Sequence, residues 1–214
     1  MIGSLGPLDP IGRIPTRQQT RVAAFLISAH GALARQLAFT LPRQMSASWQ
    51  TELNAQFYRE SEIVSLLVRA TSWTVDLEIP MLVASWEVAW LPRPVSGLSD
   101  RALASTIDVA ALGHAVHGAI RPAALLPDKA LAQDPFVMAL RRIEFESGRM
   151  IQAQILFLKG QDLLPYRDAV NTAVEDRHRQ VRDLWGDMLK GIGVERGASG
   201  QAVPSTIPRH EPNP

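Results

Sequence analysis

The sequence contains no cysteine among its 214 residues. Disulfide bonds, thiolate catalysis and metal centres that need cysteine ligands are therefore excluded. Net charge is also nearly absent, because a formal value of +1 provides no long-range field to attract a polyanion. We therefore expect no nucleic-acid partner.

Long uninterrupted apolar runs are missing as well. The most apolar window, residues 63–91, is broken by charged residues and a proline, among them Arg69, Glu78 and Pro80. A membrane span needs about 20 nearly uninterrupted apolar residues. Residues 1–15 lack the basic segment and apolar run of a secretory signal. We therefore expect a cytoplasmic protein with no transmembrane segment.

The common catalytic sequence motifs are not found. The sequence has no Gly-x-x-x-x-Gly-Lys-Ser/Thr phosphate loop, no Gly-x-Gly-x-x-Gly dinucleotide motif and no Gly-x-Ser-x-Gly nucleophile elbow. Strand-like alternation is scarce, which disfavours a doubly wound nucleotide-binding fold.

Helical periodicity is what the sequence does contain. Apolar residues recur at spacings of three and four, which predicts five long helices over about 16–42, 46–80, 99–121, 134–160 and 165–190. Pro42 and Pro80 act as stop signals, Ser99 is a candidate N-cap, Asp134-Pro135 opens a helix, and Gly191 with Gly193 ends the last one. A short segment, 81–91, precedes a Pro-rich turn. We expect an all-α bundle in one domain, 16–193, with an irregular Pro- and Gly-containing leader, 1–15, and a flexible tail, 194–214.

The helix predicted over 134–160 is apolar on two sides. One side carries Phe136, Leu140 and Ile143, and the opposite side carries residues that we also consider for an interface or a pocket: Met138, Phe145 and Leu156. A helix that is apolar on two sides is buried on two sides. We expect it to lie centrally or to join two subunits in a homo-oligomer, or to bind another protein partner.

Several apolar stripes are interrupted by polar residues: Glu60, His114, Glu144, Arg177 and His178. Buried polar groups must be paired, liganded or functional. These residues are therefore the candidate site.

One hypothesis is a carboxylate and histidine metal site. Glu175 and His178 have the Glu-x-x-His spacing of bundle di-iron and di-manganese sites, and Glu60, Glu144 and His114 could complete the ligand set. Iron or manganese is the cofactor that this hypothesis implies. Only one such motif is present where two are expected, and Glu175 could instead pair with a surface arginine.

The other interpretations of these residues are structural. Arg177 could pair with Glu60 or Glu144, since buried charges are seldom left unpaired, or it could extend to the edge of its helix. His114 is more simply a core histidine that is hydrogen-bonded to the backbone.

The tryptophans also admit two interpretations. Trp86 and Trp90 at helical spacing are usually part of a core, and they could instead mark an interaction surface. With Phe145 they could line an apolar pocket.

Three functions are compatible with this sequence. The first is a non-catalytic, oligomeric interaction or assembly protein. The second is a ferritin-like metal-dependent oxidase or oxygenase. The third is a helical small-molecule-binding or sensor domain, since bundles hold ligands between their helices. Whether the protein is an enzyme stays open at this point.

Overall fold

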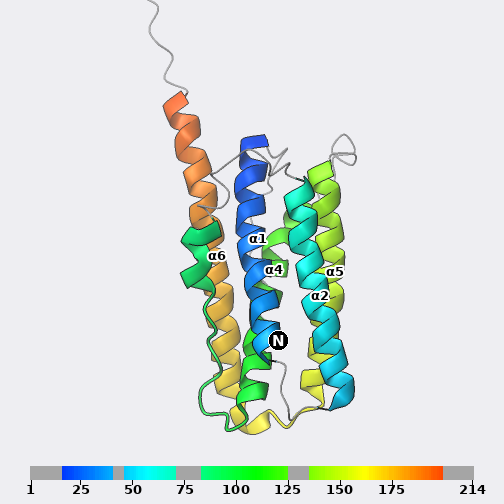
Figure 1. Cartoon of the computed structure of the whole chain (residues 1–214). Helices are drawn as coiled ribbons and strands as arrows, with labels where there is room; N and C mark the ends of the chain where they lie inside the picture. The colour runs from blue at the N-terminus through cyan, green and yellow to red at the C-terminus, as the bar shows by residue number, and fades with distance from the viewer. Residues whose placement is uncertain (1–15, 41–45, 71–82, 125–134, 200–214) are drawn as a thin grey trace, which may run out of the picture.

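A computed structural model describes residues 16–40, 46–70, 83–124 and 135–199. Its long helices are α1 (Thr16–Thr40), α2 (Ala47–Ala70), α4 (Arg101–Ala124), α5 (Pro135–Lys159) and α6 (Arg167–Ser199). Two short 3-10 helices accompany them, η1 (Glu87–Trp90) and η3 (Leu164–Tyr166). The described chain is all-α, as the periodicity predicted (Figure 1).

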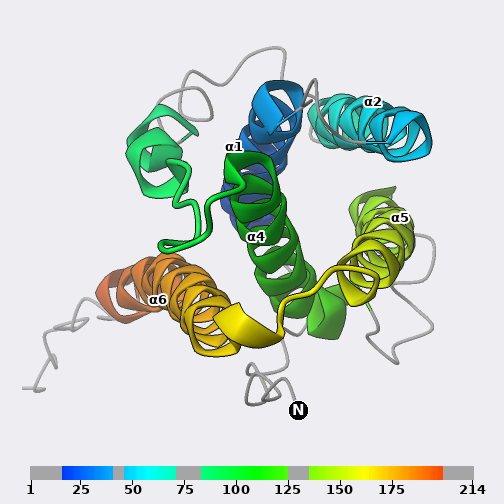
Figure 2. The same ribbon diagram turned by 90° about the horizontal axis from the view of Figure 1, so that it is seen from below.

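Helices α1, α2, α5 and α4 form a ring in which each helix packs against the next. Helix α6 packs on α4 from outside this ring and touches α1 only slightly. Seen end-on, α4 lies in the middle, with α5 and α6 on different sides of it (Figure 2). Of the two alternatives for the helix over 134–160, the central position is wrong, since α4 occupies that place, and the interface stays a prediction.

Small residues explain the central position of α4, because they let neighbouring backbones approach closely. Ala104, Ala111, Ala115 and Ala119 are all buried on this helix. On the facing helix, a Cβ atom added to Gly148 of α5 would lie 3.5 Å from the His117 Nε2 atom.

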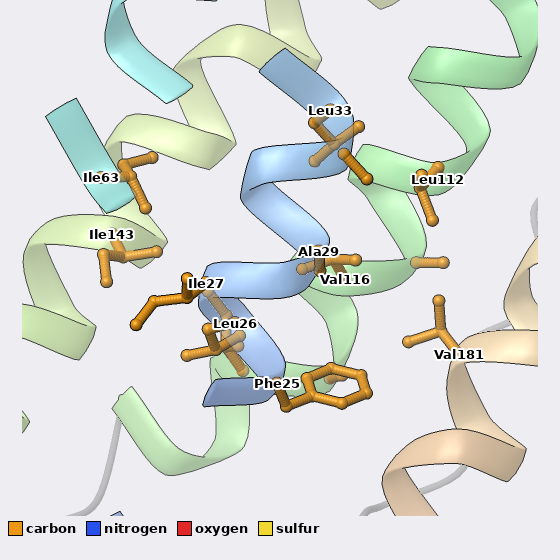
Figure 3. Close-up of a cluster of buried hydrophobic side chains, with 14 of the residues drawn as sticks. Phe25, Leu26, Ile27, Ala29, Leu33, Ile63, Leu112, Val116, Ile143 and Val181 are labelled. Carbon is orange, nitrogen blue, oxygen red and sulfur yellow. The ribbon is translucent and has the colours of Figure 1, made fainter. Parts of the chain in front are cut away.

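The core is shared by all five long helices. Figure 3 shows Leu26 and Ile27 of α1 together with side chains of the other four helices: Ile63, Leu112, Val116, Ile143 and Val181. At one end, Phe25 makes edge-on ring contacts with Trp86, Trp90 and Trp185. Such contacts between aromatic rings stabilise the fold beyond the contribution of the apolar area that the rings bury.

The helix ends agree with the sequence signals in part. Helix α5 begins at Pro135 as predicted. The N-cap of α4 is Asp100 rather than Ser99, because the Asp100 Oδ1 atom accepts hydrogen bonds from the backbone N–H groups of residues 102 and 103. Helix α6 continues through Gly191 and Gly193 to Ser199, so these glycines do not end it. The predicted leader, Pro42, Pro80 and residues 200–214 lie outside the described residues.

Two helical stretches, Gln19–Phe39 and Arg101–Arg121, are long and apolar enough to span a membrane by length and composition alone. Within the fold, 78% and 67% of these windows are buried, respectively. A buried core helix and a membrane span share this composition, so it assigns no location.

Candidate functional site

A groove of about 1040 Å³ lies over α4, between α5 and α6. Along their described lengths α5 and α6 both pack on α4 and scarcely on each other, and the turn that contains η3 joins them at one end (Figure 2). Helix α4 is therefore the floor of the groove, and α5 and α6 are its two walls.

Most of the groove surface is apolar. Aliphatic side chains come from all three helices and from the turn: Ile107, Ala110, Ala111, Ile151, Ile155, Leu158, Leu163, Val170 and Val174. Ile107 belongs to a small buried cluster with Val95 and Ala104, and Leu158, Leu163 and Val170 pack against that cluster at the end of the groove near the turn.

Charged side chains also line the groove. Four are cationic, namely Lys159, Arg167, Arg179 and Arg182, and Glu175 is the one carboxylate among the described lining residues. The rim of the groove is therefore basic although the net charge of the whole chain is close to zero.

The α6 wall is held in place by a buried ion pair between Arg177 and Asp108 of α4. The Arg177 Nε atom donates to Asp108 Oδ1 at 2.7 Å, and an Nη2 hydrogen bond reaches Oδ2 at 2.8 Å. Arg177 also donates to the backbone carbonyl of Leu91 at 2.9 Å, and the backbone N–H of Arg93 donates to Asp108 Oδ2 at 2.6 Å. The pair thus joins α4, α6 and the segment after η1, and it fixes which side of α6 faces α4.

The residue after Arg177 takes part in a second contact between these helices. His178 and His114 lie with ring centroids 4.9 Å apart and nearly parallel planes, and the His114 Nδ1 and His178 Nε2 atoms are 2.8 Å apart. When both imidazoles are neutral, one of these nitrogens donates and the other accepts. Both residues line the groove.

The environment keeps these two histidines neutral. Burial, the neighbouring His114 ring and the charge of Arg182 lower the pKa of His178 from 6.5 to about 4. Burial and then His117 lower the pKa of His114. At neutral pH the pair therefore offers hydrogen bonds to a ligand without adding charge to the groove.

The candidate metal ligands are not gathered at one point. Glu175, His114 and His178 all line the groove, whereas Glu60 and Glu144 are bound to histidines elsewhere. In the part of the chain that the structure describes, no group of three or more His, Asp or Glu side chains could hold a metal ion. The prediction of a site with all five ligands is therefore wrong, because Glu60 of α2 and Glu144 of α5 contact other histidines.

The expected pair of Glu60 with Arg177 is also corrected. The Glu60 Oε2 atom lies 2.6 Å from the His30 Nδ1 atom in a buried contact between α2 and α1. Arg177 pairs with Asp108 instead of Glu60 or Glu144. The reason is topological, since α2 packs on α1 and α5, whereas α6 packs mainly on α4. Glu144 Oε1 lies 3.3 Å from the His117 Nε2 atom.

The aromatic candidates do not line one pocket. Trp90 is buried beside Phe25, and its Nε1–H donates to the Ser28 hydroxyl at 2.8 Å, while Trp86 packs against the same core. Phe145 is 60% exposed on α5, and Met138 and Leu156 are exposed on the same helix. The groove over α4 therefore lies elsewhere than the predicted pocket.

Asp108 and His30 were not predicted as partners of the buried polar residues, although both have the same signal in the sequence. Asp108 is the only Asp, Glu, Lys or Arg between Arg101 and Arg121, and His30 is the only ionisable residue between Arg21 and Arg35. A lone ionisable residue inside an apolar helix is expected to be buried and paired. That signal could have identified both partners, although not the residues that they contact.

The sequence was compared with protein-family models, with curated proteins and with solved structures, and none of the three comparisons gives a match. Function is therefore inferred from the groove and its residues.

Proposed function

We propose that this chain is a helical binding or sensor domain that holds a small molecule non-covalently in the groove over α4. The groove is the main observation that supports this proposal. Its volume of about 1040 Å³ is at the upper end of the roughly 300–1,000 Å³ typical of ligand sites. Mostly apolar walls with a few polar groups are the usual lining of such sites.

The side chains in the groove favour binding over catalysis. No serine, threonine or tyrosine hydroxyl is among the described lining residues. The two histidines are bonded to each other, and the pKa of His178 is too low for an efficient base at neutral pH. Because the described residues gather no metal-binding group, a ferritin-like oxidase is not proposed.

The test is titration with N-phenyl-1-naphthylamine, an uncharged dye that fluoresces in apolar sites. Ala110 lies on α4 and lines the groove, so Ala110→Phe places a ring in it. Ala55→Phe makes the same change at a half-buried position on α2, which does not line the groove.

We expect saturable one-to-one binding to the wild type and to Ala55→Phe, and none to Ala110→Phe. Circular dichroism melting of all three proteins verifies that they fold. Wild-type affinity in folded Ala110→Phe would contradict the proposal, as would the absence of saturable binding to the wild type.

A second candidate function is assembly through the outer side of α5. Met138, Phe145 and Leu156 are 56%, 60% and 67% exposed. Their separations of 7 and 11 residues are near whole numbers of helical turns, so they share one side of α5. An exposed apolar stripe of this kind favours contact with a second copy or another protein.

Light scattering at micromolar concentration tests assembly. We expect Phe145→Glu to lower the measured mass, whereas Val88→Glu, which also adds a carboxylate at an exposed apolar residue, leaves it unchanged. A wild-type mass equal to that of one chain would count against this candidate.

A further inference from the structure

The cations of the groove are placed toward its two ends. Lys159 is the last residue of α5 and Arg167 is the first residue of α6, so both flank the turn that closes one end. Arg179 and Arg182 lie further along α6. At a rise of 1.5 Å per residue, Arg182 is about 22 Å along the helix from Arg167. The lining between them is largely apolar, with Val170 and Val174 on α6 itself.

These positive charges are poorly compensated within the fold. Among the described residues, Lys159, Arg167 and Arg182 belong to no ion pair, and Arg179 has only an exposed contact of 3.4 Å with Asp176. The charge of Arg182 reaches into the groove, since it contributes to the lowered pKa of His178. Glu175 alone opposes the four cations of the lining.

A buried polar atom of the lining also has no partner. The Gln154 amide nitrogen donates to Gln56 at 2.9 Å, but its Oε1 atom is buried without a hydrogen bond in the described part of the chain. Gln154 as a whole is only 5% exposed. Buried acceptors are normally bonded to protein or water. A carboxylate has no hydrogen to donate to this atom, so the anionic end of a ligand belongs at the arginines and not here.

We propose that the ligand of this groove is an organic anion with an apolar body, of which a medium-chain carboxylate is the simplest form. Its carboxylate binds at Arg179 and Arg182, and its hydrocarbon part lies over α4 against the aliphatic walls. Guanidinium groups bind carboxylates through paired hydrogen bonds. The neutral histidine pair beside Arg182 adds no charge and offers a hydrogen bond. This proposal names the ligand class for the proposed function and therefore rests on it.

The test is displacement of N-phenyl-1-naphthylamine by three compounds with the same ten-carbon chain, measured at pH 7.5 and constant ionic strength. They are decanoate, decan-1-ol and decylammonium, which differ in charge at one end. We expect decanoate to bind about threefold to tenfold more tightly than decanol, since an exposed charge pair contributes modestly, and decylammonium to bind most weakly.

Variants that remove positive charges test whether the preference for decanoate arises at Arg179 and Arg182. We expect the double variant Arg179→Gln/Arg182→Gln to weaken decanoate binding about threefold to tenfold and to leave decanol binding unchanged. The double variant Arg142→Gln/Arg149→Gln is the matched control. It also removes two positive charges from exposed positions, but it does so on α5 away from the lining. It should change neither affinity.

Several results would overturn the anion proposal. If decanol binds as tightly as decanoate, the groove does not select an anion, although the proposed binding function survives. An equal effect of the control double variant would show that only the overall charge matters.

If the dye binds and none of the three compounds displaces it, the groove does not bind a ligand with an extended hydrocarbon chain. If a second copy of the chain occupies the groove instead of a small molecule, the wild type forms dimers and Ala110→Phe is monomeric. Failure of the proposed function is seen separately, when the dye itself does not bind to the wild type or still binds to Ala110→Phe.

Discussion

Arg177 and His178 are neighbours on α6, and both are buried polar residues on a largely apolar side of that helix. Arg177 makes four hydrogen bonds, in which its guanidinium reaches Asp108, the Leu91 carbonyl and Gln180. His178 has one described partner, another neutral imidazole, and borders the groove.

The difference shows how one buried polar residue can stabilise the fold while the next is available to hydrogen-bond a ligand. A charge deep in the fold requires an opposite charge, which Asp108 provides. Asp108, Leu91 and Gln180 together accept four hydrogen bonds from Arg177, so little bonding capacity remains for a ligand. A neutral ring needs far less compensation, so His178 can stay beside an open groove with one of its nitrogens uncommitted to His114.

The largest expected change in the free energy of unfolding is at Arg177, which has the structural role. Arg177→Gln leaves the Asp108 carboxylate buried without its countercharge, which should lower the free energy of unfolding by about 3–5 kcal/mol. Urea unfolding measures this change. Arg179→Gln, two residues away and exposed, should cost less than about 0.5 kcal/mol. If both variants unfold at the wild-type urea concentration, the buried pair is not what fixes α6.

A second comparison involves the two histidine–glutamate contacts. The side chains of His30 and Glu60 are 1% and 7% exposed, and those of His117 and Glu144 are 16% and 23% exposed. Glu60→Leu would leave both ring nitrogens of His30 without a partner, since Nε2 has none in the described structure. We expect a loss of about 1–3 kcal/mol.

Glu144→Leu is the matched variant for that measurement, and we expect it to cost less than about 1 kcal/mol, because water can replace the lost partner. Equal losses in chemical denaturation would mean that burial does not decide the strength of these contacts.

The third prediction concerns pH and isolates His178. Its pKa is about 4 in the fold against an ordinary value of 6.5, so acid protonates the unfolded chain first. The contribution of His178 is fully present above about pH 6.5 and is lost as the pH falls toward 4. The groups that act on its titration are His114 on α4 and Arg182 on α6, with Glu175 also in the groove.

We expect His178→Gln to lose less stability than the wild type between pH 7 and pH 5, by about 1–2 kcal/mol. Urea unfolding at the two pH values gives this difference. Acid-sensitive groups that do not contact His178 cancel in the comparison, and its partner His114 is present in both proteins. A variant with the same pH dependence as the wild type would show that His178 is not the titrating group.

The smallest expected effect is on the outer side of α5. Met138→Ser should change the free energy of unfolding by less than about 0.5 kcal/mol, because Met138 is exposed. Phe136→Ala, two residues away and buried, should cost about 3–5 kcal/mol. These unfolding measurements need a concentration at which light scattering shows a monomer. A large cost for Met138→Ser under that condition would place this side of α5 inside the fold.

Local signals predicted the helices well, because each depends on a short stretch of sequence. The periodicity of apolar residues and the proline at position 135 act within a few turns, and the structure has helices there. The glycine stop at residues 191 and 193 was wrong, since a glycine weakens a helix by only about 1 kcal/mol relative to alanine and does not forbid it.

The site could be predicted only as a set of polar residues on apolar stripes. Pairing depends on which helices face each other, and no local pattern tells that α2 faces α1 and that α6 faces α4. The sequence therefore suggests Glu60 or Glu144 as the partner of Arg177, and the structure has Asp108 there. The groove itself arises because α5 and α6 flank α4 without packing on each other, which is a property of the assembled bundle.

The contact between His114 and His178 has a consequence for the kinds of group that the groove can match. When both rings are neutral, one proton lies between them, so the two remaining ring nitrogens always comprise one donor and one acceptor. A shift of both tautomers exchanges these roles without changing the net charge of the pair. Each of the two free ring nitrogens can therefore act as the donor or as the acceptor. A carboxylate needs a donor, whereas a hydroxyl group can use either.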